Sequence, residues 1–409
     1  MAKFGLLGKT LKHSFSPQIH KILSGYDYDL IEINEDGLEK FVKSGKYDGF
    51  NITIPYKKEI IKYLDVVDET AKKIGAVNTV VKKDGKLLGY NTDWFGMEYA
   101  LKKAGINLSN KKVLILGSGG TSNTANFVAN HLGAREVLIV SRKGEINYQN
   151  CYKQADAEII INTTPVGMFP NNYASPIDLT KFTKLEGVFD AVYNPDMTLL
   201  TFSANELGVK NANGLTMLVA QAKMASELFT DSAINNDKID KAVEIIRKQN
   251  LNIVLIGMAG VGKSTIAKEL SKKLCRPFVD TDSLIEQKEN RKISDIFAES
   301  GEDYFRKIES EVLREVGRKT GKIIATGGGI VERKENHFYL KQNGIIFNLV
   351  RDIEKLDRTN RPLSTDIDAV KKLFDKRKEK YIEYSDYTID NNGDINQTIE
   401  KIMEKLWKF

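Results

Sequence analysis

The chain is predicted to be an α/β protein with largely parallel sheets, and two observations carry this prediction. Short apolar runs of strand length alternate with stretches of helical spacing along almost all of the 409 residues. Two glycine-rich turns each join such a run to a helical stretch, as in parallel α/β units. The predicted strands, in chain order, cover residues 4–7, 49–54, 113–116, 137–140, 159–162, 188–191, 253–256, 323–325 and 345–349.

The bulk composition is that of an ordinary globular protein and argues against several classes. Hydrophobic residues make up 41% and charged residues 28% of a chain whose length fits two or three domains. The net charge of +6 suits small anionic ligands, and no basic block with interleaved aromatics favours nucleic acid. The 2 cysteines and 4 histidines show no metal-site or disulfide spacing. No signal peptide or membrane-length apolar run is recognised, so we expect a cytoplasmic protein without membrane partners.

Three stretches are the predicted joints between compact units: residues 105–112, 231–238 and 248–252. The segment 238–249 has helical spacing and is expected to close the first half of the chain. Only a few residues then remain as a tether before the strand at 253–256, so the two halves are not expected to separate far.

The most specific motif is GMAGVGKS, residues 257–264, which follows an apolar run and precedes a helical stretch. It matches G-x-x-x-x-G-K-[ST] in the strand–turn–helix context of a phosphate-binding loop. Lys263 should reach the β- and γ-phosphates of a nucleotide, and Ser264 should bind Mg²⁺. The alternative is a glycine turn without a ligand. The expected ATP-binding residues of the loop are Gly257, Ala259, Gly260, Val261, Gly262, Lys263, Ser264 and Thr265.

The second glycine turn, within KVLILGSGGTSNTA at residues 112–125, lacks the third glycine of the dinucleotide fingerprint and is a weak signal alone. The next predicted strand leads into Ser141, Arg142 and Lys143. An NAD enzyme would carry an acidic residue there for the ribose 2′-hydroxyl, whereas basic side chains favour the 2′-phosphate of NADP. The alternative is a solvated basic turn.

Seven polar clusters of the first half could each be turn or helix-cap chemistry when taken alone. Together, in this order, they resemble shikimate dehydrogenase closely, over residues 1–247. The resemblance implies a substrate domain, a Rossmann-like cofactor domain and NADPH-dependent reduction of a 3-keto group. The clusters are HSFSP (13–17), NITIPYK (51–57), AVNTV (76–80), GYNTDWFG (89–96), INTTPVGM (161–168), FDAVYNP (189–195) and NGLTMLVAQA (213–222).

The resemblance also implies a role for each matching residue. Lys57 and Asp93 match the catalytic pair, in which the ammonium supplies a proton to the ketone and the carboxylate orients it. Ser14 and Ser16 are expected to bind the substrate carboxylate. Thr53, Asn78 and Gln221 are expected to hydrogen-bond the substrate hydroxyls, and Tyr193 is expected to line the same site. NADP is expected on Gly117, Ser118, Gly119, Gly120, Thr121, Ser141, Arg142, Lys143, Gly214 and Met217.

Two departures from the shikimate dehydrogenase pattern stand out. Where a second arginine often follows Arg142, this chain has Glu145, which would repel a phosphate if it pointed inward. The first turn reads Gly-Lys-Thr-Leu-Lys at residues 8–12 instead of Gly-x-Pro-Ile, which does not affect the two serines.

Further polar motifs follow the phosphate-binding loop. Asp280 and Asp282 stand two residues apart at a predicted strand end, on opposite faces if extended, so that one can serve Mg²⁺ and the other the phosphate acceptor. Arg306 and Glu309 share one helix face. The segment ATGGGI, residues 325–330, ends a strand in three glycines and suits close approach of a ligand.

The end of the chain adds Arg361 in a polar, lid-like stretch, and Arg377 and Tyr381 four residues apart. In this order the motifs resemble shikimate kinase over residues 252–409. The resemblance implies catalytic roles for Lys263 and Asp282, Mg²⁺ on Ser264 and Asp280, and Arg358 over the adenine. Only two residues separate Arg358 from Arg361, so the lid is short for the family. The implied shikimate-binding residues are Asp282, Arg306, Gly328, Gly329, Arg361 and Arg377.

The complete prediction is a substrate α/β domain (1–95 and 213–248), a Rossmann-like NADP-binding domain (96–212) and a P-loop kinase domain with a parallel sheet (252–409). We expect a bifunctional enzyme of aromatic amino acid biosynthesis. It would reduce 3-dehydroshikimate with NADPH and then phosphorylate shikimate with ATP and Mg²⁺. The alternative is a quinate-type dehydrogenase, or a non-catalytic sensor, fused to another small-molecule kinase. A homodimer is compatible with the sequence, which does not determine the oligomeric state.

Overall fold

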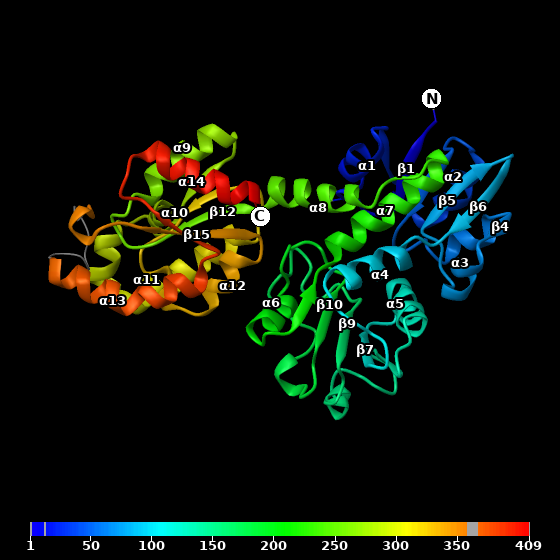
Figure 1. Cartoon of the computed structure of the whole chain (residues 1–409), viewed down its shortest axis with the longest axis horizontal. Helices are drawn as coiled ribbons and strands as arrows, with labels where there is room; N and C mark the ends of the chain where they lie inside the picture. The colour runs from blue at the N-terminus through cyan, green and yellow to red at the C-terminus, as the bar shows by residue number, and fades with distance from the viewer. Residues whose placement is uncertain (1, 12–13, 358–366, 409) are drawn as a thin grey trace. The chain divides into compact units, whose positions relative to one another are not determined.

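The computed structural model describes residues 2–11, 14–357 and 367–408, and the predicted α/β class with parallel sheets is confirmed. The chain divides into two compact units, Met1–Ile246 and Arg247–Phe409 (Figure 1). The boundary falls inside helix α8 (Asp237–Asn250), which confirms the helix predicted there. Strand β12 begins at Asn252, so Leu251 alone separates α8 from it. Within the described residues, no helix is long and apolar enough to span a membrane.

The first sheet of the first unit is mixed, with strand order β2-β1-β3-β5-β6-β4. β1 pairs in parallel with β2 and β3, whereas β5 pairs antiparallel with β3 and β6. β4 also pairs in parallel with β6, so this sheet, too, is mostly parallel, with antiparallel pairing only around β5 among the described strands. The β5–β6 turn has positive φ at Asp84 (52°) and Gly85 (78°), as a tight hairpin requires. The strands are Phe4–Gly8 (β1), Tyr28–Glu32 (β2), Gly49–Ile52 (β3), Val66–Val67 (β4), Thr79–Lys83 (β5) and Lys86–Tyr90 (β6).

The strand predicted at residues 49–54 ends two residues early, at Ile52. Pro55 has no N–H group for a sheet ladder, and the chain turns at Thr53, whose carbonyl accepts the N–H of Tyr56 at 3.0 Å. This early turn carries Lys57 away from the strand direction. Short helices follow the strands of this sheet: α1 (Ser16–Ser24), α2 (Leu38–Lys43), α3 (Glu69–Ile74) and the 3-10 turns Glu35–Gly37 and Glu59–Tyr63.

The second sheet is fully parallel, with order β11-β10-β9-β7-β8. Alternate side chains of β7 enter different cores: Val113 and Ile115 pack with α4 and α5, and Leu114 and Leu116 pack with α6. Helices therefore cover both faces, as Figure 1 shows for α5 and α6. The elements are Lys112–Leu116 (β7), Glu136–Val140 (β8), Ile159–Asn162 (β9), Gly187–Asp190 (β10), Lys210–Ala212 (β11), Asp93–Lys103 (α4), Gly120–His131 (α5), Leu199–Glu206 (α6), and the 3-10 turns Cys151–Gln154 and Leu179–Lys181.

Helix α7 (Gly214–Thr230) returns from the second sheet and packs closely on α4. The contact needs a glycine at position 96, because a Cβ there would collide with the carbonyl of Met217 and lie 3.0 Å from Cβ of Gln221. The close contact holds α4, which begins at Asp93, against the helix that carries Gln221.

The second unit has one five-stranded sheet, all parallel, in the order β13-β14-β12-β15-β16. One hydrophobic core covers this unit, from Leu251 to Leu406. Helix α11 breaks at Gly301, whose φ is 80°. The elements are Asn252–Ile256 (β12), Phe278–Asp280 (β13), Ile323–Ala325 (β14), Gly344–Val350 (β15), Tyr387–Asp390 (β16), Lys263–Leu274 (α9), Thr281–Glu289 (α10), Ile293–Gly317 (α11), Glu335–Lys341 (α12), Ile367–Tyr384 (α13), Ile395–Lys408 (α14), and the 3-10 turns Ile330–Glu332 (η5) and Ile353–Lys355 (η6).

Candidate active sites

Lys57 and Asp93 form a half-enclosed ion pair in the first unit. Lys57 follows the turn after β3, and Asp93 is the first residue of α4, directly after β6. The distance from Nζ of Lys57 to Oδ2 of Asp93 is 2.6 Å, and the two side chains are 16% and 9% exposed. A lysine that is nearly buried beside one carboxylate, yet still reached by solvent, can hold and release a proton at one fixed point.

Neutral polar groups fix the carboxylate of that pair. Oδ1 of Asp93 accepts the Nδ2–H of Asn78 at 2.8 Å, and the same amide lies 3.0 Å from Oγ1 of Thr92 and 3.4 Å from Oε1 of Gln221. Thr92 also donates to Gln221 at 3.2 Å. The predicted residues Lys57, Asp93, Asn78 and Gln221 therefore belong to one hydrogen-bond network.

The other predicted substrate residues lie in loops after neighbouring strands. Oγ of Ser14 donates to Oγ of Ser16 at 3.1 Å, and Ser16 opens α1, after β1. Thr53 follows β3, the parallel neighbour of β1, and donates its N–H to Leu7 at 2.9 Å. Tyr193 is near these loops through Phe15, whose ring centroid is 5.6 Å from its own. Burial raises the pKa of Tyr193, which keeps its hydroxyl protonated.

The second glycine turn lies at the carboxyl ends of β7 and β8. Gly117 has a φ of 113°, and a Cβ there would lie 2.6 Å from Oγ1 of Thr163. Nothing lies within 4 Å of a Cβ placed on Gly119, and one on Gly120 would contact Cδ of Lys57 at 3.9 Å. The start of α5 thus has open space for an anion beside the Lys57–Asp93 pair. Ser118 is exposed and Thr121 half-buried in the same turn.

The basic residues Arg142 and Lys143 are exposed directly after β8, with Ser141 half-buried before them. The N–H of Gly117 donates to the carbonyl of Val140 at 2.8 Å, so both turns lie at one edge of the sheet. Glu145 is exposed too. Across the sheet, Gly214 opens α7 with no room for a Cβ beside Ala191, and Met217 is buried one turn later.

In the second unit the phosphate-binding loop has the expected glycine geometry. Gly257, Gly260 and Gly262 have positive φ values of 135°, 83° and 97°. Lys263 opens α9, is 7% exposed, and donates to the carbonyls of Gly257 and Met258 at 2.8 Å each. Of the remaining predicted loop residues, Ala259 lies against Gly328, Val261 accepts from Nδ2 of Asn391 at 2.6 Å, and Thr265 is exposed on the first turn of α9.

Ser264 and Asp280 meet at the end of β13. Oγ of Ser264 donates to Oδ2 of Asp280 at 2.6 Å, while Oδ1 of Asp280 accepts the N–H groups of Asp282 and Ser283 at 3.0 and 3.3 Å. Asp280 and Asp282 were expected on opposite faces if the backbone were extended, and at Asp282 it is helical. Helix α10 begins at Thr281, so Asp280 caps it and Asp282 lies in its first turn.

The Ser264–Asp280 pair suits Mg²⁺, because this ion prefers oxygen ligands and usually keeps several waters. Within residues 2–11, 14–357 and 367–408, no three His, Cys, Asp or Glu side chains are gathered in a way that could hold a metal ion.

Arg306 lies buried between two glutamates of its own helix. Its Nη1 donates to Glu309 at 2.8 Å, and its Nη2 and Nε donate to Glu302 at 3.0 and 3.2 Å. A Cβ atom placed on Gly329 would collide with this guanidinium. A Cβ atom placed on Gly327 would lie 2.7 Å from Oε1 of Glu309 and 2.8 Å from Oδ1 of Asp282. Burial, reinforced by the charge of Asp282, raises the pKa of Glu309 against the effect of Arg306. Gly327 and Gly329 thus border the carboxylates of Asp282 and Glu309 and the guanidinium of Arg306.

Arg377 and Tyr381 reach the same glycine loop from α13. Nη1 of Arg377 donates to the carbonyl of Gly328 at 3.3 Å, and the hydroxyl of Tyr381 donates to the same carbonyl. Nε of Arg377 donates to Glu332 at 2.8 Å. The structure therefore places Arg306 beside Gly329 and Arg377 beside Gly328. The predicted Arg358 and Arg361 lie outside the described residues.

Three site residues were not predicted. Thr92 lies within the quoted GYNTDWFG motif, directly before Asp93, and Glu302 is one helical turn before Arg306, so each had a local signal. Glu332 had none, because it is 45 residues away from Arg377 along the chain.

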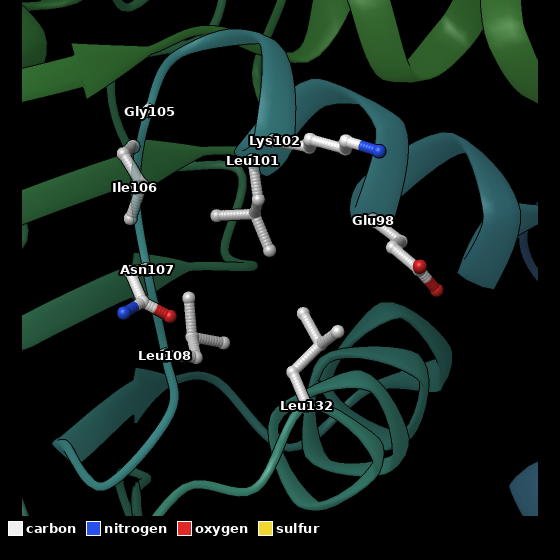
Figure 2. Close-up of a pocket in the computed structure, with 8 residues that line it drawn as sticks. All are labelled: Glu98, Leu101, Lys102, Gly105, Ile106, Asn107, Leu108 and Leu132. Atoms are coloured by element: carbon white, nitrogen blue, oxygen red, sulfur yellow. The ribbon is translucent and has the colours of Figure 1, made fainter.

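Two cavities lie beside α4, apart from these sites. The smaller, of about 310 Å³, opens between Leu101, Ile106, Leu108 and Leu132 (Figure 2). The larger, of about 630 Å³, is lined by Trp94, Phe95, Glu98, Tyr99, Lys102, Lys103 and Asn236. Neither lining contains a predicted site residue, so the candidate sites rest on hydrogen bonds and loop geometry.

Comparisons with known proteins agree with this division. The family model of the shikimate dehydrogenase substrate binding domain matches residues 6–80, and the shikimate kinase model matches residues 259–407. The chain is 42% identical to the shikimate dehydrogenase (NADP(+)) of Caldicellulosiruptor bescii over 259 residues, covering 56% of this chain and 90% of the relative.

Solved structures are similar to the first unit. Shikimate 5-dehydrogenase of Thermus thermophilus, in complex with NADP(H) and shikimate, is 30% identical with a TM-score of 0.55, covering 60% of this chain and 99% of that one. Quinate dehydrogenase of Corynebacterium glutamicum, in complex with NAD, is 26% identical with a TM-score of 0.54, covering 60% of this chain and 98% of that one.

Proposed function

The chain belongs to the shikimate dehydrogenase family and carries a shikimate kinase domain after it, and from this premise we propose how the residues of each site act. It is a bifunctional enzyme of the shikimate pathway, an NADP-dependent shikimate dehydrogenase and a shikimate kinase. The first activity reduces 3-dehydroshikimate to shikimate, and the second phosphorylates shikimate to shikimate 3-phosphate. The observation that supports this division best is the presence of one separate polar constellation in each unit.

In the first unit Lys57 is the proton donor to the developing alkoxide at C3. Its ammonium is 2.6 Å from the carboxylate of Asp93, which orients it toward the substrate. Asn78 holds the other oxygen of Asp93 at 2.8 Å, so the carboxylate cannot rotate away. NADPH supplies the hydride. The residues thus keep the transferable proton at one atom, Nζ of Lys57.

The substrate is held by polar groups around this pair. Ser14 and Ser16 bind its carboxylate with their hydroxyls, which lie 3.1 Å apart. Thr53, Asn78 and Gln221 take its hydroxyls, and Tyr193 lines the site with a protonated phenol. Because Asn78 and Gln221 also bind Thr92, their amides are held in orientation before substrate arrives.

The NADP pyrophosphate fits the turn from Gly117 to Thr121, where the open space at Gly119 admits a phosphate. Ser141, Arg142 and Lys143 bind the 2′-phosphate at the end of β8, and both basic side chains are exposed and able to reach it. Gly214 and Met217 border the nicotinamide from the start of α7.

In the second unit the loop from Gly257 to Thr265 binds the phosphates of ATP, and Lys263 neutralises charge on the transferring group. Ser264 and Asp280 hold Mg²⁺, which adds further neutralisation when bound. We assign Arg358 to the adenine and Arg361 to the acceptor and the phosphoryl group from the family resemblance alone.

Shikimate fits the space bordered by Gly328 and Gly329. Asp282 lies at this loop, contacts the reacting 3-hydroxyl group of shikimate and accepts its proton. Arg306 and Arg377 bind the substrate carboxylate with their remaining N–H groups, because a guanidinium matches a planar carboxylate.

Two assays test this proposal against the alternatives. NADP⁺-linked oxidation should be faster with shikimate than with quinate, and ADP release should require shikimate rather than AMP or gluconate. A preference for quinate would support the quinate-type alternative, and binding of shikimate without turnover would support a sensor. A better acceptor among the other compounds would assign the second unit to a different kinase class.

Compartment and assembly complete the proposal. Cys151 and Cys275 are both free thiols, which fits a reducing cytoplasm. A homodimer is the simplest oligomer to test, by sedimentation at assay concentration. A mass equal to one chain would remove the homodimer from the proposal.

A further inference from the structure

Glu332 is the carboxylate on which three cations of α13 converge. Its Oε1 is 2.8 Å from Nε of Arg377 and 3.1 Å from Nζ of Lys376, and its Oε2 is 3.3 Å from Nζ of Lys380. The side chain of Glu332 is 12% exposed and that of Arg377 is 5% exposed. Glu332 ends the 3-10 turn η5, which follows the three-glycine loop directly. The pair therefore joins α13 to the loop that borders the kinase substrate.

The bond to Glu332 restricts how Arg377 can point. A guanidinium has five N–H donors in one plane. One is held by Glu332 through Nε, and another, on Nη1, by the carbonyl of Gly328 at 3.3 Å. These two anchors fix the plane of the group, and its remaining donors are on the Nη atoms. The orientation is set before a ligand binds.

We propose that Glu332 is a positioning residue of the kinase, which holds the guanidinium of Arg377 in the plane that receives the carboxylate of the acceptor. The proposal rests on the proposed function, in which Arg377 binds that carboxylate. Glu332 itself does not touch the substrate; it acts through Arg377. Among the described residues, Glu332 is the acidic side chain with a hydrogen bond to Arg377, and the charge of Arg377 also acts on Glu309.

Glu332 also has an effect on substrate binding that opposes its positioning of Arg377. Its negative charge also repels the substrate carboxylate, so its removal would strengthen long-range attraction. Lys376 and Lys380, which it faces, have side chains 62% and 40% exposed, so solvent screens much of this electrostatic change. The bond to Arg377 is part-buried and charge-assisted, between side chains that are 5% and 12% exposed, so its loss is screened less. Positioning therefore outweighs repulsion.

Glu332→Gln tests the proposal in the full chain. The KM for shikimate should rise about tenfold, because the neutral amide oxygen of the variant holds Nε of Arg377 more weakly than the carboxylate does. The kcat should change less than about twofold, and the KM for ATP and the dehydrogenase activity should not change. Glu332→Asp, which keeps the charge, should recover part of the loss. The matched control is Glu335→Gln, at a side chain 47% exposed three residues away. A lower or unchanged KM for shikimate in Glu332→Gln would overturn the proposal.

A substrate analogue separates positioning from a general structural effect. The carboxamide of shikimate lacks the charge that Arg377 would bind, so Glu332→Gln should change its KM much less than that of shikimate. If both KM values rise equally, Glu332 supports the fold alone and the proposal fails. Arg377→Ala separates this failure from failure of the proposed function. An unchanged KM for shikimate in that variant would remove Arg377 from substrate binding, whatever Glu332 does.

Discussion

The two site lysines face different partners, and the difference separates proton transfer from phosphate binding. Lys57 in the first unit is 2.6 Å from a carboxylate, so the pair carries no net charge when both groups are ionised. Lys263 in the second unit donates to two neutral backbone carbonyls at 2.8 Å each. A proton donor benefits from a partner that stabilises its charged form. A phosphate-binding lysine benefits from keeping its full charge for the nucleotide.

Removal of Lys57 should have the largest effect. Lys57→Ala deletes the proton donor at the developing alkoxide, so the turnover rate of the dehydrogenase should fall by roughly 10²–10⁴. Shikimate phosphorylation should be unchanged, since the kinase constellation lies in the other unit. Lys58→Ala, at the exposed neighbour, is the matched control. Near-normal reduction by Lys57→Ala would show that another group supplies the proton.

Removal of Lys263 in the second unit should nearly stop phosphorylation and leave the dehydrogenase active. Lys263→Ala removes the charge at the phosphates, and the phosphorylation rate should fall about a hundredfold or more while reduction continues. Both rates are measured on one preparation, as ADP release and as NADPH oxidation. A parallel loss of dehydrogenase activity would mean that the variant disturbs the first unit too, and the comparison between the lysines would not hold.

Buried carboxylates differ between the units in the same way. Asp190 is fully buried among neutral donors, and burial raises its pKa from 3.8 to about 6 although Thr198, Val192 and Asn162 donate to it. Burial acts against the charge of Glu332 as well, but hydrogen bonds from Arg377 and Lys376 lower its pKa from 4.5 to about 2. Cations on α13 therefore decide the sign of the shift.

These shifts predict opposite pH dependences of stability. The folded state holds the Asp190 proton more tightly than the unfolded state does, so stability falls as pH rises from about 4 to about 6. Relative to Asp190→Asn, the wild-type chain should lose on the order of 3 kcal/mol over that window, from 2.2 pKa units (6 − 3.8). The Glu332 contribution is lost only as pH falls from 4.5 towards 2, so Glu332→Gln should show no such change above pH 5.

Urea unfolding in a Trp407→Phe background measures the Asp190 contribution, because Trp94 is then the remaining one of the 2 tryptophans and lies in the first unit with Asp190. For Glu332→Gln, urea unfolding is followed by the fluorescence of Trp407 in a Trp94→Phe background, because Trp407 and Glu332 both lie in the second unit. A constant difference between wild type and Asp190→Asn from pH 4 to 6.5 would contradict the raised pKa.

The sequence could predict features carried by local motifs, and it could not predict side-chain partners that packing brings together. Local patterns identified β7 to β10 of the second sheet and β12, β14 and β15 of the third, but not β11 or β16. Short motifs also singled out Lys57, Asp93, Lys263 and Ser264 as candidates. The β5–β6 hairpin was missed although its Asp84-Gly85 turn is a recognised signal. The edge strand β2 was missed because its five residues are mostly exposed and show no apolar run.

Tertiary pairings had no local signal at all. Glu332 meets Arg377 only because α13 packs on the 3-10 turn after the glycine loop. Asp280 and Asp282 were placed at a strand end, on opposite faces if extended, but Asp280 caps α10 and Asp282 lies in its first turn. Side-chain partners fixed by packing need the fold before they can be identified.

Arg142 offers the smallest and most specific test, because its charge is exposed and acts on one phosphate of the cofactor. Arg142→Ala should raise the KM for NADP⁺ about tenfold, which corresponds to about 1.4 kcal/mol. It should leave the KM for NAD⁺ within about twofold, because NAD⁺ lacks the 2′-phosphate.

Glu145, three residues on and also exposed, gives the sign control for Arg142. Glu145→Gln removes a negative charge near the same turn, so it should leave the KM for NADP⁺ unchanged or lower it. Equal effects of Arg142→Ala on both cofactors would mean that Arg142 does not contact the 2′-phosphate. The preference for NADP⁺ would then depend on Lys143 or Ser141, and Lys143→Ala would have to show the selective loss that Arg142→Ala lacked. The exposed turn after β8 would still distinguish the cofactors, but through a side chain other than the one whose guanidinium fits a phosphate best.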